Sequence, residues 1–233
     1  MTLNPIQLFD TESSTYTYIL AAPGDDQAVI IDPVERHWER DLRHLERLNL
    51  KLAYILETHA HADHVTSAGK LRELTGAKAC VPSGCGIPPA DQQLSDGDVI
   101  RFGAGEEITV LHTPGHTAGS MSYLWRGNVF TGDTLLINGC GRTDFQSGSS
   151  DALYDSVVEK LFTLPGATRV WPGHDYKEQA VSTIGWEKEH NARLAHKSKA
   201  EFARIMSELN LPKPKLIDIA VPANQNLGLP HGA

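Results

Sequence analysis

Cysteine is scarce in this sequence, and long apolar runs are absent. Three cysteines, Cys80, Cys85 and Cys140, occur in 233 residues, with no C-x-x-C pair. This pattern argues against a disulfide framework and against a structural zinc held by cysteines, and it fits reduced thiols. No apolar run approaches the roughly 18 to 20 residues that span a bilayer, so we expect no transmembrane helix.

Basic residues are also fewer than acidic residues. The chain has 21 Lys and Arg against 29 Asp and Glu, a formal net charge of -8, which repels phosphate backbones and anionic lipid. We therefore expect no nucleic-acid partner and no membrane-surface role. The first basic residue is Arg36, so the N-terminal region lacks the basic character of a signal or transit peptide. These features favour the cytoplasm, unless a presequence has been removed.

Common nucleotide-binding and hydrolase motifs are missing, whereas histidine is abundant. The sequence contains no G-x-x-x-x-G-K-[ST] phosphate loop, no G-x-G-x-x-G fingerprint and no G-x-S-x-G nucleophile elbow. It does contain eleven histidines, five of them in short turn-like clusters. Histidine in such clusters serves metal ligation or proton transfer, so the function is expected there.

The hydrophobic pattern predicts one α/β domain over residues 1–233. Alternating apolar residues predict strands at 16–20, 28–31, 52–57, 78–81, 99–102, 107–112, 120–125, 128–131 and 169–171. Three- and four-residue periodicity predicts helices at 34–48, 65–74, 149–162, 186–196 and 201–209. Strands with a helix, followed again by strands with a helix, favour two sheets between outer helix layers. Segment 211–233 is rich in proline, and we expect it to be extended and packed on the surface.

Four apolar strands are each followed by a turn and a potential metal ligand. The segments are LAYILETHAHADH, ITVLHTPGH, NVFTGD and RVWPGH, and they present His59, His61, Asp63, His64, His116, Asp133 and His174. Packing alone gives no reason to crowd four titratable groups into residues 59–64. Imidazole and carboxylate donors suit borderline metals such as zinc or iron, so the sequence predicts a metal site.

These motifs resemble the metal motifs of the metallo-β-lactamase superfamily. THAHADH, TPGH, TGD and PGH occur in the family's order, and the resemblance implies an αβ/βα four-layer sandwich with the metal at one edge. Within the superfamily, GCGRTDFQ, PGHDY and the ending LPKPKLIDIAVPAN resemble the persulfide dioxygenases. GCGR alone also resembles the glyoxalase II hydrolases, so the TDFQ continuation and the proline-rich ending favour the dioxygenases.

The seven donors are compatible with two reactions. In one arrangement the seven donors hold two metals, as in glyoxalase-type hydrolases. His59, His61 and His116 would bind one metal, Asp63, His64 and His174 the other, and Asp133 would bridge them. The resemblance to persulfide dioxygenases instead implies one ferrous ion per chain, held by His59, His116 and Asp133. It then implies that glutathione persulfide and O2 react to give sulfite and glutathione. The remaining four donors would surround the ligands and orient them.

Two further residues are candidates for substrate binding. Arg142 follows the metal loop and offers a planar fork for a glutathione carboxylate, or else it fixes the glycine-rich loop. Tyr176 lies two residues after His174 and could present its hydroxyl to the substrate. Family resemblance also implies a homodimer. The alternatives to a dioxygenase are a glyoxalase II-like hydrolase of glutathione thioesters and a metal- or thiol-binding sensor without turnover.

Overall fold

Two six-stranded β-sheets pack face to face in the computed structural model, which describes residues 4–22 and 24–230. The first sheet has the order β1 (Ile6–Asp10), β2 (Thr15–Ala21), β3 (Gln27–Ile31), β4 (Lys51–Leu56), β5 (Lys78–Pro82) and β6 (Gln92–Leu94). The second has the order β12 (Ser182–Thr183), β11 (Arg169–Pro172), β10 (Asn128–Gly132), β9 (Met121–Trp125), β8 (Glu106–His112) and β7 (Val99–Phe102). Strands β1, β6 and β12 are not predicted from the sequence pattern, because they are short or lie at sheet edges.

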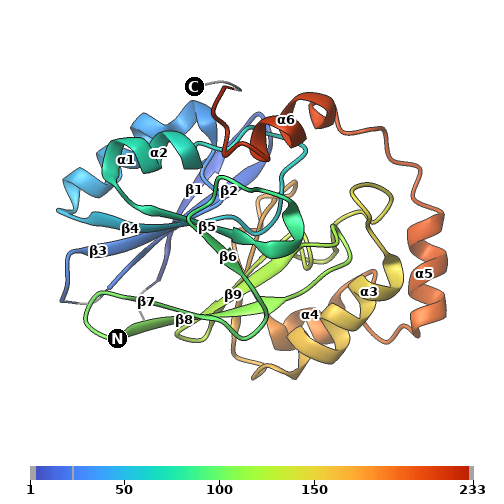
Figure 1. Ribbon diagram of the computed structural model, residues 1–233. Helices are drawn as coiled ribbons and strands as arrows, with labels where there is room; N and C mark the ends of the chain where they lie inside the picture. Colours follow the sequence, from blue (N-terminus) through green and yellow to red (C-terminus); the bar gives the residue numbers. More distant parts are fainter. Residues whose placement is uncertain (1–3, 23, 231–233) are drawn as a thin grey trace.

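Helices cover the outer face of each sheet (Figure 1). On the first sheet lie α1 (Trp38–Arg47), α2 (Ala68–Thr75) and α6 (Ile217–Asn224). On the second lie α3 (Ser150–Asp155), α4 (Ile184–His190) and α5 (Lys199–Ser207), and α3 continues as a π-helical turn over Ser156–Lys160 and a 3-10 turn over Leu161–Thr163. The predicted four-layer sandwich is confirmed. No helix in the described part of the chain is long and apolar enough to cross a membrane.

Successive side chains of a strand point to opposite faces of its sheet, and they pack into three hydrophobic cores. Tyr18 and Leu20 of β2 are buried between the sheets, whereas the intervening Ile19 is buried beneath the helices with Ile30 and Leu71. A strand that is buried on both faces carries a continuous apolar run, which explains the sequence AVII in β3. The third core lies between β10 and β11 and the helices that cover the second sheet.

Parallel strands determine where the functional loops meet. β3, β4 and β5 are parallel neighbours, and so are β10 and β11. The carboxyl ends of parallel strands lie at one edge of a sheet, where ligands bind in open α/β folds. The segments that follow β4, β10 and β11 carry the predicted metal ligands.

The proline-rich ending differs from the prediction of an extended segment. Residues 217–224 form α6, with Pro222 inside the helix. The prolines at 212, 214, 222 and 230 leave residues 215–221 free of proline, which is long enough to form two helical turns. Leu227, just after α6, packs beneath α2 with Ala68 and Leu71, and this tertiary burial outweighs the helix penalty of Pro222. Residues 231–233, part of the predicted surface segment, lie outside the described residues.

Asp10 holds the turn that connects β1 to β2. Its carboxylate accepts hydrogen bonds from the backbone N–H and the hydroxyl of Ser13, at 3.1 and 2.5 Å, and lies 3.0 Å from His37 Nε2. Burial alone raises the pKa of Asp10, but these donors and the nearby Arg36 outweigh it and lower the pKa from 3.8 to about 2. The ionised carboxylate therefore stabilises the folded state.

We expect Asp10→Asn to lower the free energy of unfolding at pH 7 by about 2 kcal/mol, since each pKa unit corresponds to about 1.36 kcal/mol. Because the pKa is depressed on folding, this stabilisation is present above pH 3.8 and is lost as the pH falls towards 2. Urea titrations at pH 7, 5 and 3 measure the difference. The control is Asp26→Asn, at a surface ion pair with Lys51, which should change stability little. A difference for Asp10→Asn that does not shrink at pH 3 would contradict this role.

Candidate metal centre

All seven predicted donors meet at one edge of the two sheets. His59, His61, Asp63 and His64 follow β4, His116 follows β8, Asp133 follows β10 and His174 follows β11. One ligand atom from each of His59, His116 and Asp133 lies within 4.8 Å of the others, and His61, Asp63 and His64 form a second such group. His174 Nε2 lies 3.4 Å from Asp133 Oδ2 and 3.6 Å from Asp63 Oδ2, which joins the two groups.

His59 is held by a chain of hydrogen bonds that fixes its protonation. The hydroxyl of Thr58 donates to Asp32 Oδ2 at 2.8 Å, so its oxygen can accept from His59 Nδ1, 3.0 Å away. Burial, with the neighbouring His61 and His116, holds the pKa of His59 well below its usual value. The ring is therefore neutral, and the lone pair on Nε2 has no partner among the described residues.

His116 and His174 follow the same plan. His116 Nδ1 donates to the carbonyl of Arg142 at 2.7 Å, and His174 Nδ1 donates to the carbonyl of Ser14 at 3.1 Å. The Nε2 atom of each ring then faces Asp133 Oδ2, at 3.5 Å for His116. Burial lowers the pKa of His174, but Asp133 and Asp63 outweigh it and raise the pKa. A metal ion bound by Asp133 would take the place of a proton on these Nε2 atoms.

His61 lies deeper and is bound by two buried carboxylates. Its Nε2 lies 3.1 Å from Glu57 Oε2 and 3.1 Å from Asp32 Oδ1. Burial alone lowers the pKa of His61, but Asp32 and Glu57 outweigh it, so the pKa is raised well above its usual value. These contacts occupy Nε2, and Nδ1 has no partner among the described residues.

Asp63 is engaged by hydrogen-bond donors. Asp63 Oδ2 accepts from the Thr15 hydroxyl at 3.0 Å and from His64 Nδ1 at 2.9 Å. Burial raises the pKa of Asp63, but His64 and His174 outweigh this effect and the pKa falls well below its usual value. The carboxylate is therefore ionised and already has two donors.

The donor atoms fit a bound metal ion. Four buried atoms of this cluster have no hydrogen-bond partner among the described residues: His59 Nε2, His61 Nδ1, His64 Nε2 and Asp133 Oδ1. Buried polar atoms normally have a partner, and orphans gathered in one place indicate a missing one. Nitrogen and carboxylate donors suit zinc or ferrous iron.

A cavity of about 890 Å³ opens onto these donors. Its lining includes Asp63, His116, Asp133 and His174, the segments 136–142, 175–177 and 211–216, and Gln179. Tyr176 and Arg142 line it as well. The Tyr176 ring is stacked on His174, with centroids 5.7 Å apart, and the residue is 70% exposed.

Arg142 is engaged by the protein itself. Its Nε and Nη2 each donate to the Asp144 carboxylate at 2.7 Å, and Nη1 donates to the carbonyl of Pro212 at 2.7 Å. Nη2 also donates to the carbonyl of Leu211 at 3.3 Å. These contacts join the loop after Asp133 to the proline-rich segment.

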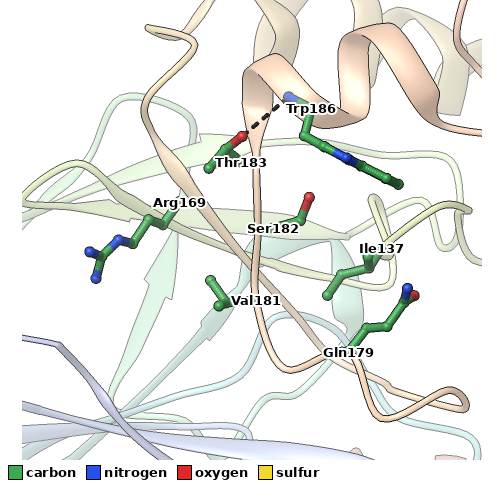
Figure 2. A pocket seen from close by; sticks show the side chains of 7 residues that line it. All are labelled: Ile137, Arg169, Gln179, Val181, Ser182, Thr183 and Trp186. Carbon is green, nitrogen blue, oxygen red and sulfur yellow. Dashed lines mark hydrogen bonds between the residues drawn. The ribbon is translucent and has the colours of Figure 1, made fainter.

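A second hollow, drawn in Figure 2, shares Ile137 and Gln179 with this cavity. It has a volume of about 390 Å³, and its lining residues are Ile137, Arg169, Gln179, Val181, Ser182, Thr183 and Trp186. Thr183 accepts a hydrogen bond from the backbone N–H of Trp186 and so caps α4 (Figure 2). None of the predicted site residues lines this hollow.

Sequence reasoning missed the residues that orient the ligands. Asp32, Glu57, Thr58 and Thr15 are all buried and contact the histidines or Asp63. A signal is present in the sequence, since Asp32 directly follows the apolar run of β3 and Glu57 and Thr58 directly follow β4. Charged residues at the ends of buried parallel strands point to a site even without ligand spacing.

Comparisons with known proteins agree with the fold and identify the family. Residues 10–174 match the model of the metallo-beta-lactamase superfamily. The chain is 46% identical, over 96% of its length and 88% of the relative's, to "Persulfide dioxygenase ETHE1, mitochondrial" of Homo sapiens. It is 30% identical, over 84% of its length and 77% of the relative's, to "Hydroxyacylglutathione hydrolase cytoplasmic" of Arabidopsis thaliana.

A solved structure gives the same assignment. The crystal structure of ETHE1 from Myxococcus xanthus superimposes with a TM-score of 0.95 at 52% identity, and the match covers 97% of this chain and 100% of that one. The resemblance inferred from the sequence motifs is thus confirmed over nearly the whole chain, and the hydrolase relative is more distant. The chain belongs to the metallo-β-lactamase superfamily and, within it, to the persulfide dioxygenase family.

Proposed function

We propose that the protein oxidises glutathione persulfide with O2, using one ferrous ion held by His59, His116 and Asp133. The reaction consumes one persulfide, one O2 and one water, and releases glutathione, sulfite and two protons. The observation that carries the proposal is the set of two histidine nitrogens and one carboxylate oxygen within 4.8 Å of one another, in a chain of this family. Two histidines and one carboxylate on one face leave positions open for substrate and oxygen.

The contacts of the remaining donors support one metal ion per chain. Asp63 Oδ2 already accepts from Thr15 and His64, and His61 is held by Glu57 and Asp32 with a raised pKa. A metal ion at Asp63 Oδ2 would compete with these two donors, and the carboxylates already hold His61 through its Nε2. We therefore assign His61, Asp63, His64 and His174 to orienting the ligands and bound water.

The chemistry divides between the metal and the chain. Ferrous iron supplies the one-electron chemistry with O2 that zinc, which has no redox change, cannot supply. Thr58 and the Arg142 carbonyl fix the rings of His59 and His116, so their Nε2 atoms stay aimed at one point. His174 and Asp63 line the cavity, where they can hold protons or accept them from water. We propose that Tyr176, stacked on His174, presents its hydroxyl to the bound substrate.

We expect the wild-type protein to contain close to one iron per chain and to consume O2 with glutathione persulfide. An oxygen electrode, with parallel measurement of sulfite, gives the stoichiometry of one sulfite per O2. Glutathione alone and S-lactoylglutathione should give no oxygen uptake. Exchange of iron for zinc should abolish oxygen uptake, because only the iron form can activate O2.

The hydrolase alternative makes the opposite prediction. His61 Nδ1 and His64 Nε2 are also orphaned, and one relative is a hydroxyacylglutathione hydrolase. Two tightly held metal ions per chain, together with hydrolysis of S-lactoylglutathione and no oxygen uptake with the persulfide, would overturn the dioxygenase assignment. Protein without turnover on either substrate would instead favour a sensor.

Location and assembly are part of the proposal. We propose a cytoplasmic enzyme, in keeping with its acidic charge, and a homodimer, by analogy with the family. Cell fractionation tests the first statement. Light scattering on the eluted protein tests the second.

A further inference from the structure

The cavity beside the metal donors is lined by both acidic and basic side chains. Its acidic lining residues are Glu12, Asp63, Asp133 and Asp175, and the cations lining it are Arg36, Arg142, Lys177, Arg193, Lys213 and Lys215. Three of these six are neutralised by an acidic partner: Arg36 by Glu12, Arg142 by Asp144 and Lys213 by Asp218. The described residues offer no ion pair to the other three.

Among the unpaired cations, only Arg193 is partly buried. Lys177 and Lys215 are exposed and flexible side chains. Arg193 Nη1 donates to the carbonyl of Cys140 at 2.6 Å and lies 3.7 Å from Cys140 Sγ. Within residues 4–22 and 24–230, Nε and Nη2 have no hydrogen-bond acceptor. These two nitrogens form the fork that binds a carboxylate side-on.

The backbone around Arg193 is fixed to the loop that follows the metal ligand Asp133. The Arg193 backbone N–H donates to Asn191 Oδ1 at 3.1 Å, and Asn191 Nδ2 donates to the carbonyl of Gly139 at 3.0 Å. Asn191 Nδ2 also donates to the buried Glu187 at 2.8 Å, and Asn138 accepts from the Ala192 N–H at 2.9 Å. A guanidinium held in this way loses little freedom when it binds a ligand.

Arg142 and Arg193 therefore have different tasks. The Arg142 fork is saturated by Asp144 and by the carbonyls of segment 211–212, so this arginine holds one cavity wall in place. The Nε and Nη2 atoms of Arg193 have no acceptor among the described residues, and Arg193 lines the same cavity as His116 and Asp133.

We propose that Arg193 binds a carboxylate of the glutathione moiety and is the main determinant of the preference for the tripeptide persulfide. This inference rests on the proposed function. Glutathione offers two carboxylates, one on the glycine residue and one on the γ-glutamyl residue, and both share the chemistry that the fork recognises. Because the carboxylates of glutathione take no part in the reaction at the persulfide sulfur, this contact should stabilise the ground state and the transition state equally.

The experiment measures oxygen uptake with three persulfides in wild type and in Arg193→Ala. The substrates are the persulfides of glutathione, of its glycine ethyl ester and of cysteinylglycine, so that each of the last two lacks one carboxylate. With glutathione persulfide, Arg193→Ala should raise KM by roughly 10- to 100-fold and leave kcat within about twofold. With the substrate that lacks the bound carboxylate, wild type and variant should have equal KM, and this identifies which carboxylate Arg193 binds.

Two further variants separate recognition from structural support. Arg204→Ala removes an exposed arginine of α5, paired with Glu208, and should leave every parameter unchanged. Arg193→Lys keeps the charge without the fork and should fall between wild type and Arg193→Ala. Iron content and thermal unfolding show whether each variant is folded.

The results also distinguish this inference from the proposed function. If wild type oxidises glutathione persulfide but Arg193→Ala leaves KM unchanged, or raises it equally for all three substrates, Arg193 does not bind a carboxylate. If wild type consumes no O2 with glutathione persulfide, the proposed function itself fails.

Discussion

Asp133→Asn is expected to lose bound iron and oxygen uptake together. Asp133 is the one carboxylate in the compact group with His59 and His116, and its Oδ1 is buried without a partner among the described residues. Loss of a residue that only orients a ligand already costs roughly 10- to 100-fold in metal affinity or activity. Loss of the anionic ligand itself should cost more than about 100-fold in kcat. Metal analysis and an oxygen electrode measure the two effects.

The matched control is Asp63→Asn, the same change in a carboxylate of the same cavity. Asp63 is held by Thr15 and His64, so its amide should disturb their hydrogen bonds and leave most of the iron bound. Equal loss of metal in both variants would show that Asp63 is also a ligand. That outcome favours the site with two metal ions, in which Asp133 bridges.

The cluster of potential metal donors could be predicted because its pattern is local. His59, His61, Asp63 and His64 lie within six residues of one another, directly after a recognisable strand, and each of the other ligands follows a strand and a glycine-containing turn. The layer order also follows from the sequence, since buried parallel strands carry continuous apolar runs.

The residues that support the ligands could not be predicted in this way. Asp32 reaches Thr58 and His61 only because β3 and β4 are parallel neighbours, and sequence spacing does not reveal this contact. Arg142 meets the carbonyls of Leu211 and Pro212, about 70 positions away, so its occupied fork is a property of the tertiary structure. The helix α6 was missed for a similar reason, since burial beside α2 outweighs the proline content of the segment.

Arg193 likewise could not be recognised from the sequence as a candidate for substrate binding. Nothing in the sequence around residue 193 marks it as functional, and its position in the cavity depends on Asn191, Asn138 and the loop carbonyls. An arginine becomes a candidate for substrate binding when its neighbours in the fold leave its donors without acceptors.

Gly141→Ala is expected to disrupt the metal centre without removing any ligand. A methyl group at this position would lie 2.3 Å from the carbonyl oxygen of Asp133 and 2.9 Å from His116 Nδ1. The Gly141 N–H also donates to that carbonyl at 2.7 Å, so the loop cannot move away without losing the bond. Overpacking of this kind costs about 1 to 3 kcal/mol, and here the strain falls on two proposed ligands. Iron affinity should therefore fall roughly 10- to 100-fold, with a parallel loss of oxygen uptake.

The neighbouring Gly139 provides the matched control for this variant. A methyl group at Gly139 would meet nothing within 4 Å, so Gly139→Ala, in the same loop, should bind iron as wild type does. Iron titration of the metal-free proteins, followed by thermal unfolding, separates a lost metal site from a lost fold. Wild-type iron affinity in Gly141→Ala would mean that Asp133 and His116 tolerate displacement, and equal losses in both variants would assign the effect to loop stiffness and not to the ligand contacts. The close approach of Gly141 to both side chains leads us to expect a defect in Gly141→Ala alone, because only there does the added carbon occupy space that Asp133 and His116 need.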